Sequence, residues 1–222
     1  MTTLATLPGL LLAATLASGP GELVAEGARW WSVSPDPGNP VACATCHHDP
    51  ATVRGWAASF PKLKPLPPPH ARVMTLRQAN AEAVALHYRD PAPGHAATAI
   101  TAYLTALGAE TVIAPGMSPG QPVFRERIAA LAASVKRGDR LFLRRCAGCH
   151  RPGEAAARLR GFPRLRDGRA EPVESFLEAH HPIGPPLRWD DPRIADVVAA
   201  LVGRLAGRPL GGPEIAIRKE SP

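Results

Sequence analysis

The four cysteines of this chain all fall inside two pentapeptides of the same form, Cys-x-x-Cys-His. Cys43, Cys46 and His47 belong to the first pentapeptide, and Cys146, Cys149 and His150 belong to the second. No cysteine is left over for a structural disulfide. A fold of this length must therefore be held by packing and by whatever the two motifs bind, and disulfide cross-links cannot hold it.

Cys-x-x-Cys-His is typical of the covalent attachment of c-type haem. The two thiols add to the vinyl groups of the porphyrin, and the histidine that follows binds the iron from one face. We therefore predict two haem c groups as cofactors. The predicted attachment residues are Cys43, Cys46, Cys146 and Cys149, and the predicted proximal iron ligands are His47 and His150.

Two other chemistries also use Cys-x-x-Cys pairs. One is a redox-active dithiol, and the other is a zinc site in which two pairs supply four thiolates. Neither chemistry requires a histidine directly after the second cysteine. This chain has that histidine twice, at His47 and His150, which favours haem.

The two motifs lie in similar surroundings, which indicates an internal duplication. Before each motif, on a predicted helix, a glycine stands four residues ahead of an aromatic: Gly27 before Trp31, and Gly138 before Phe142. One helical turn places each pair on one face, where the glycine lets another helix approach closely. After each motif comes the same Phe-Pro-basic-Leu-basic sequence.

Each half then continues with a helix that ends in histidine and an Ala-rich amphipathic helix. These helices are predicted over 75–87 and 96–104 in the first half, and over 172–180 and 193–202 in the second. Few period-two strands are visible, so the predicted fold class is all-α. The Pro/Gly-rich residues 33–40, present in the first half only, are predicted to form a surface loop.

This repeated order resembles tandem class I c-type cytochromes, the dihaem two-domain proteins of bacterial periplasms, over most of residues 26–206. The resemblance implies two small cytochrome c-like helical domains, each wrapped around one covalent haem. The predicted domains are 26–108 and 123–207, joined by a Gly/Pro/Ser-rich linker at 109–122 and followed by a C-terminal tail at 208–222. In that family, a loop resembling Phe60-Pro61 and Phe162-Pro163 packs beside the proximal histidine, so these four residues are predicted haem contacts.

A second and shorter likeness links the first half to the haem subunits of thiosulfate-oxidising complexes. It covers residues 53–62 and 75–78. Those subunits use a cysteine as the distal iron ligand after the segment that resembles 75–78. This chain has no cysteine there, which is a departure from that pattern.

The distal axial ligand decides what each haem can do. Class I cytochromes usually use methionine, but no methionine follows His150. For the second haem we predict His180, with His181 as the alternative. For the first haem we predict His87, which is the repeat counterpart of His180, with Met74 as the alternative.

Met117 in the linker and an open iron are further alternatives for the first haem. Two imidazoles lower the reduction potential relative to an imidazole–thioether pair, because methionine ligation raises it. Six-coordinate iron has no place for a substrate. The predicted ligands therefore favour electron transfer over bond chemistry.

The formal net charge is +7, and all of it falls in residues 123–222, since residues 1–122 are neutral overall. Two haems would offset about four of these charges through their propionates. A basic second half favours acidic redox partner proteins. Nucleic acid is not an expected partner, because no aromatic-and-basic stripe is visible.

The apolar segment from Leu7 to Ala17 is too short to span a bilayer, so no transmembrane span is predicted. It resembles a signal peptide, with small residues at 17–19 as a cleavage zone. Residues 1–25 are therefore predicted to be a signal peptide or an N-terminal anchor close to the membrane. Haem c is attached outside the cytoplasm in bacteria, which predicts a periplasmic protein.

Three functions fit these features. The leading prediction is an electron carrier that passes electrons between redox partners and is not an enzyme. The second is a haem enzyme or catalytic subunit with one open iron, acting in sulfur-compound oxidation or in a peroxidase-like reaction. The third is a haem subunit of a larger complex or filament.

Overall fold

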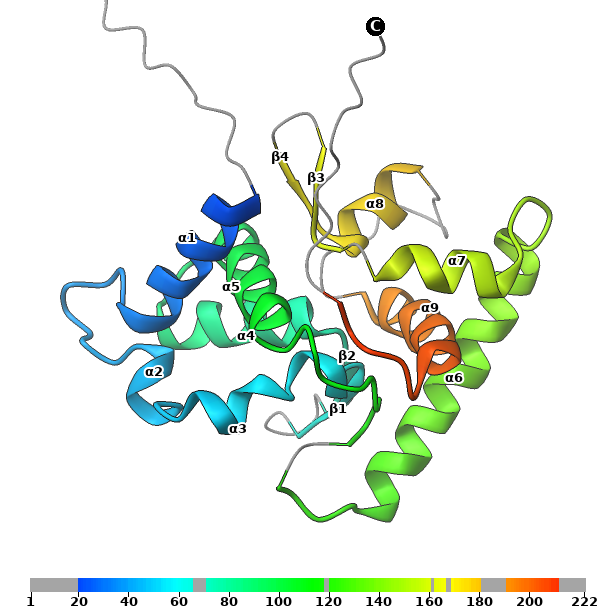
Figure 1. The fold of residues 1–222 in the computed structure, drawn as a ribbon, viewed down its shortest axis with the longest axis horizontal. Helices are drawn as coiled ribbons and strands as arrows, with labels where there is room; N and C mark the ends of the chain where they lie inside the picture. Colours follow the sequence, from blue (N-terminus) through cyan, green and yellow to red (C-terminus); the bar gives the residue numbers. More distant parts are fainter. Residues whose placement is uncertain are drawn as a thin grey trace, which may run out of the picture.

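The fold was analysed in a computed structural model, which describes residues 20–65, 71–117, 120–160, 162–166, 169–180 and 191–211. Helices dominate these residues, and the only strands among them form two short two-stranded sheets. The predicted all-α fold class is confirmed. Figure 1 shows the first half, from α1 to α5, beside the second half, from α6 to α9.

The first half contains five helices, one 3-10 turn and one hairpin in its described residues. They are α1 (Pro20–Ser32), α2 (Cys43–Cys46), α3 (Pro50–Arg54), the turn η1 (Ala57–Ser59), β1 (Lys62–Lys64), β2 (Arg72–Met74), α4 (Leu76–His87) and α5 (Gly94–Leu107). Helix α1 begins six residues before the predicted domain start at residue 26. Leu23, in its first turns, is buried against Ala99 and Ala102 of α5. Residues 33–40 form the predicted loop.

The second half repeats this order. Its elements are α6 (Arg125–Arg145), α7 (Pro152–Leu159), β3 (Arg164–Arg166), β4 (Arg169–Glu171), α8 (Val173–His180), α9 (Pro192–Val202) and the 3-10 turn η2 (Gly203–Leu205). Residues 1–19 of the predicted signal peptide or anchor at 1–25 lie outside the described part of the chain, and residues 20–25 belong to α1. Within the described segments, no helix is both long and apolar enough to cross a membrane.

The helix pairs α1–α5 and α6–α9 cross at the two glycines of the repeat. A Cβ added at Gly27 would lie 2.0 Å from the carbonyl oxygen of Ala99, and one added at Gly138 would lie 1.9 Å from that of Asp196. Real Cβ atoms do not approach backbone oxygens so closely. The predicted role of these glycines in close helix approach is therefore confirmed.

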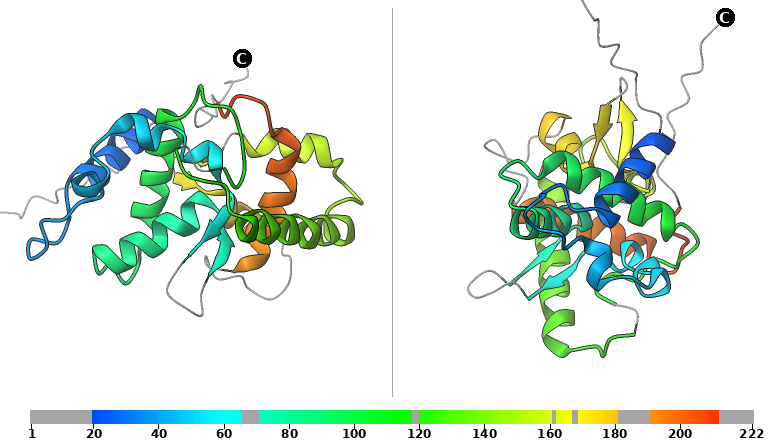
Figure 2. Two further views of the ribbon diagram at one scale, coloured as in Figure 1. Left: turned by 90° about the horizontal axis from the view of Figure 1, so that it is seen from below. Right: turned by 90° about the vertical axis from the view of Figure 1, so that its left-hand side faces the viewer.

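Each half also carries an antiparallel hairpin that the sequence did not reveal. Lys62 pairs with Met74 in β1–β2, and Arg164 pairs with Glu171 in β3–β4. Strands of three residues are too short to show a period-two pattern. The first hairpin packs against α6 and α9 of the second half, and β4 packs against α5 of the first half, so the contact is reciprocal. Figure 2 shows β1–β2 against α6 from two further sides.

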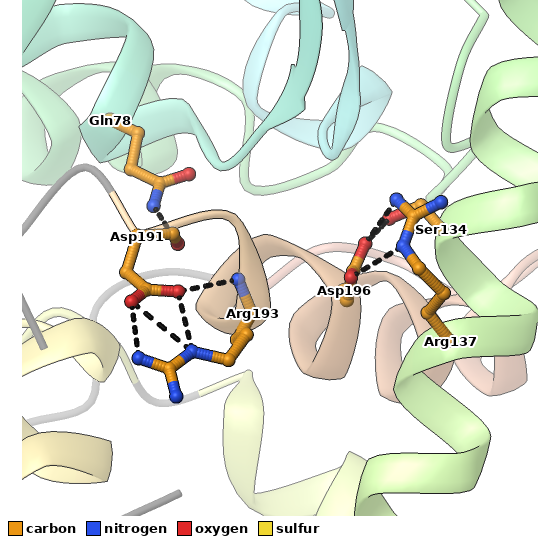
Figure 3. A network of polar contacts seen from close by, with 6 residues as sticks. All are labelled: Gln78, Ser134, Arg137, Asp191, Arg193 and Asp196. Atoms are coloured by element: carbon orange, nitrogen blue, oxygen red, sulfur yellow. Dashed lines mark hydrogen bonds and ion pairs between the residues drawn. The ribbon is translucent and has the colours of Figure 1, made fainter. Parts of the chain in front are cut away.

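Polar contacts fix the closing helix of the second half (Figure 3). Asp191 is the N-cap of α9, where its carboxylate accepts from the Arg193 backbone N–H at 2.8 Å and Pro192 occupies the first helical position. The Gln78 amide donates to the Asp191 carbonyl at 3.1 Å across the two halves. Farther along α9, buried Asp196 accepts bonds from Ser134 and Arg137 of α6.

A second cross-half contact lies at the start of α4. Thr75 caps this helix, and Gln78 completes the capping box. The Thr75 hydroxyl also donates to the buried carboxylate of Glu174 in α8. Gln78 and Thr75 thus join the histidine-bearing helix of the first half to the second half.

Candidate haem sites

The first Cys-x-x-Cys-His motif opens onto a cavity of about 480 Å³. Helix α2 is a single turn, so Cys43 and Cys46 lie on one face and both line the cavity together with His47. The volume is typical of cofactor sites, which span about 300–1,000 Å³. Much of the wall is apolar or aromatic. The apolar and aromatic residues of this wall include Trp31, Trp56, Phe60, Leu63, Leu76, Val84 and Ile100.

His87, the last residue of α4, lines the same cavity as His47. Its backbone carbonyl accepts a bond from the Asn39 amide at 2.6 Å, which ties the end of α4 to the loop before the motif. Met74 does not line the cavity; its side chain is fully buried at the end of β2. Met117 is 46% exposed and is also absent from the cavity wall. Of the three residues considered as the distal ligand of the first haem, His87 lines this cavity, whereas Met74 and Met117 do not.

Aromatic rings surround the imidazole of His47. The Trp56 ring meets it edge-on, with centroids 4.7 Å apart, and the Trp31 ring lies 6.0 Å away. Burial lowers the pKa of His47, and the charges of Lys64 and His87 lower it further. A neutral imidazole is the form that binds a metal. The surroundings of His47 therefore favour its ligating form.

Tyr88 holds the first cysteine in place. Its hydroxyl donates to the Trp30 carbonyl at 2.6 Å, accepts from the Cys43 backbone N–H at 3.3 Å, and lies 3.3 Å from the Cys43 sulfur. Burial raises the pKa of the Cys43 thiol and, in the second motif, that of the Cys146 thiol. Reactive dithiols need a lowered cysteine pKa. These surroundings disfavour the dithiol alternative.

Zinc binding by the four thiols is also disfavoured. The two motifs belong to different halves, and Cys146 lies in the core cluster of the second half. No group of three or more His, Cys, Asp or Glu side chains comes together as a metal site anywhere in the described ranges. The two cysteine pairs therefore do not form a four-thiolate site.

The second motif follows the end of α6. Cys146 is buried, packed in a core cluster with Phe142, Ile194 and Leu177. Cys149 is exposed, and the His150 backbone N–H bonds to the Cys146 carbonyl at 2.9 Å. His180 is the last residue of α8, the counterpart of His87 at the end of α4, and the predicted alternative His181 lies outside the described residues.

The two Phe-Pro loops meet at the contact between the halves. Phe60 lines the cavity at the first motif, whereas Pro61 does not. Phe60, Pro61, Phe162 and Pro163 all line a second cavity of about 120 Å³ between the halves. Phe162 also packs on Phe176 of α8, with ring centroids 5.3 Å apart. The loops therefore sit between the two halves as well as beside the first motif.

Sequence reasoning missed several residues of the first cavity. Lys62, Lys64 and Arg127 line it, and Arg127 comes from α6 of the second half. The two lysines are the basic positions of the repeated Phe-Pro-basic-Leu-basic sequence, which was a usable signal. Nothing in the sequence pointed to Arg127, because its approach depends on how the halves pack.

No protein-family model matches the chain, and a search of curated proteins found no match. Among solved structures, SoxXA from P. pantotrophus is similar in fold, with a TM-score of 0.66 and 15% sequence identity. The similarity covers 88% of this chain and 78% of the SoxXA chain. The chain therefore has the predicted all-α, cytochrome c-like fold.

Proposed function

We propose that this chain is a c-type cytochrome that transfers electrons between redox partners. The observation that carries the proposal is the cavity that brings together Cys43, Cys46, His47 and His87. Two thiols, two imidazoles and an apolar wall are what a covalently held, six-coordinate haem requires. A bound haem c would supply a one-electron couple at its iron.

The chain's own residues set the conditions for that couple. Cys43 and Cys46 would hold the porphyrin covalently, and His47 and His87 would bind the iron. Trp31 and Trp56 exclude water from the His47 side. If two imidazoles bind the iron, they would leave no coordination site for a substrate, and a low reduction potential is expected.

A second haem at Cys146, Cys149 and His150 extends the proposal to a dihaem carrier. It rests on the repeated motif and on the repeated helix order, since α8 ends at His180 as α4 ends at His87. His181 remains the alternative distal ligand. We further propose export to the periplasm, where haem c is attached in bacteria, and an acidic redox partner for the basic second half.

The test is visible absorption and low-temperature EPR spectroscopy of the purified, haem-loaded protein. A pyridine haemochrome assay should give two haems per chain, and both ferric signals should be low-spin, with no methionine–iron charge-transfer band. Absence of covalent haem would contradict the proposal.

A variant assigns the distal ligand of the first haem. His87→Ala should convert one low-spin signal to high-spin and allow carbon monoxide to bind. The matched control is His95→Ala, since His95 is 64% exposed and pairs with Glu26 away from the cavity. If His87→Ala leaves both signals low-spin, His87 is not the ligand.

The second candidate function is a catalytic haem subunit that acts on sulfur compounds. The likeness of residues 53–62 and 75–78 to the haem subunits of thiosulfate-oxidising complexes favours it. It requires an iron that a substrate can reach. A high-spin signal in the wild-type protein that shifts on addition of cyanide would favour this candidate over the carrier.

A further inference from the structure

Three cations line the first haem cavity: Lys62 and Lys64 from β1, and Arg127 from α6. The lysines belong to the first half, whereas Arg127 belongs to the second. Gln121, from the segment before α6, lines the cavity beside Arg127 and accepts a bond from its guanidinium at 3.0 Å. Part of the wall of the first site is therefore made by residues beyond the first half.

Two of the three side chains, Lys62 and Arg127, are held in place by contacts of their charged ends. Lys62 is buried; its ammonium donates to the Ser59 hydroxyl at 2.8 Å and lies 4.4 Å from the Phe60 ring centroid. The Arg127 guanidinium lies 5.1 Å from the Phe124 ring centroid. Hydrogen bonds and ring contacts of this kind keep the charged ends of Lys62 and Arg127 at the cavity.

The cations are close enough to repel one another. Burial lowers the pKa of Lys62 to about 7, and the charges of Lys64 and Arg127 contribute to that shift. Burial and Arg127 likewise lower the pKa of Lys64. No aspartate or glutamate is among the described residues that line the cavity. A largely apolar cavity with three cations on its wall is suited to a ligand that carries negative charge.

We propose that Lys62, Lys64 and Arg127 form a carboxylate-binding site that receives the propionates of a haem in this cavity. This inference rests on the proposed function, because it assumes that the cavity holds a haem. Beyond the proposed function, this inference states that Arg127 of the second half completes the first haem site. A guanidinium suits a carboxylate through two parallel N–H bonds, and an ammonium suits it as a point charge.

The experiment compares Arg127→Gln with Arg125→Gln in the haem-loaded full chain. Both changes remove one positive charge from the start of α6, but Arg125 does not line the cavity. Haem content is measured by pyridine haemochrome assay, and reduction potentials are measured by spectroelectrochemical titration. Removal of a cation beside the propionates favours the more positive ferric state. In Arg127→Gln, the reduction potential of one haem should fall. The one-electron equilibrium constant should change several-fold to tenfold, which corresponds to a fall of up to about 59 mV.

Arg125→Gln should change the same equilibrium constant by less than about twofold, so that the potential stays within about 20 mV of wild type. Lys64→Gln provides a second variant from the other half and should lower the same potential as Arg127→Gln. Equal potentials in wild type, Arg127→Gln and Lys64→Gln, at full haem content, would overturn the propionate site and leave the cytochrome proposal standing. A wild-type chain without covalent haem would overturn the cytochrome proposal itself.

Discussion

At the scale of single residues, the Tyr88 side chain connects three segments that surround the first cavity. Its hydroxyl links the end of α1 through Trp30, the motif turn through Cys43, and the end of α4 directly beside His87. One side chain thus fixes the distance between the attachment turn and the helix that carries the proposed distal ligand. Substitution there should disturb the site without unfolding the half.

Tyr88→Phe should lower the free energy of unfolding by about 1 kcal/mol, because it removes hydrogen bonds of a largely buried hydroxyl. Urea unfolding, followed by far-UV circular dichroism, measures the change. The control is Tyr103→Phe, since the Tyr103 ring packs on Trp31 as the Tyr88 ring packs on Trp30. An equal loss of unfolding free energy in the two variants would show that the hydrogen bond between Tyr88 and Cys43 does not contribute to stability.

A motif with a fixed local geometry allowed the sequence to predict which residues lie together at the first cavity. Cys43 and Cys46 lie on one face of a single helical turn, and His47 follows directly at its C-cap, so all three line one cavity. His87, predicted from its place in the repeat, lines the same cavity, and its role as an iron ligand stays a prediction. Arg127 could not be found, because its place in the cavity depends on the packing of α6 against the other half, which local sequence does not encode.

At the scale of elements, the helix crossings are the most constrained feature of the fold. Gly27 and Gly138 each lie against the backbone of the closing helix of their half. The sequence predicted these crossings from spacing alone, and it predicted the main helices from their apolar periodicity. It did not predict the hairpins, because strands of three residues are held by contacts with the other half.

Gly27→Ala and Gly138→Ala should each destabilise the protein by about 1–3 kcal/mol, since a methyl group forces apart two helices that touch. Gly21→Ala is the control, because it lies on α1 with no atom within 4 Å of the added Cβ. That variant should be neutral or stabilising by up to about 1 kcal/mol, as alanine favours helix. Thermal unfolding distinguishes the two classes, and a loss in Gly21→Ala as large as in Gly27→Ala would contradict the crossing argument.

The N-cap of α9 gives a prediction that depends on pH. The Arg193 guanidinium hydrogen-bonds the Asp191 carboxylate and lowers its pKa, with help from the capped backbone N–H. A carboxylate with a lowered pKa in the folded state adds stability above its ordinary value of 3.8, and this stability is lost as the pH falls through the folded value.

Asp191→Ala should therefore lower the free energy of unfolding near neutral pH by about 1 kcal/mol. The difference from wild type should shrink as the pH falls below 4. Urea unfolding over a pH series measures both effects. Asp139→Ala is the control, since its pair with Arg204 is 39–42% exposed and should contribute little. A difference that stays constant down to low pH would rule out the charge contribution.

At the scale of the whole molecule, the two halves pack against each other through their hairpins and helices. The first hairpin packs against helices of the second half, and Gln78 of α4 bonds to the start of α9. Unfolding of one half would expose these contacts in the other. The predicted domains at 26–108 and 123–207 are therefore in contact through elements of both halves.

The haem-loaded chain should unfold in one transition. Visible absorption of the haems and far-UV circular dichroism should give coincident urea midpoints. Gln78→Ala should move both midpoints together, with a loss of about 1 kcal/mol. Two separated transitions, with only one affected by Gln78→Ala, would show that the halves are stable separately.

The reciprocal contact of hairpins and closing helices has a consequence for the history of the chain. Here a surface of one half contacts the equivalent surface of the other half. The same arrangement is found in an isologous dimer, in which residue i of one subunit contacts residue j of the other and j contacts i. Fusion of two copies of one ancestral gene would preserve such an interface within a single polypeptide. Residues 109–122 would then be the segment that joined two former subunits.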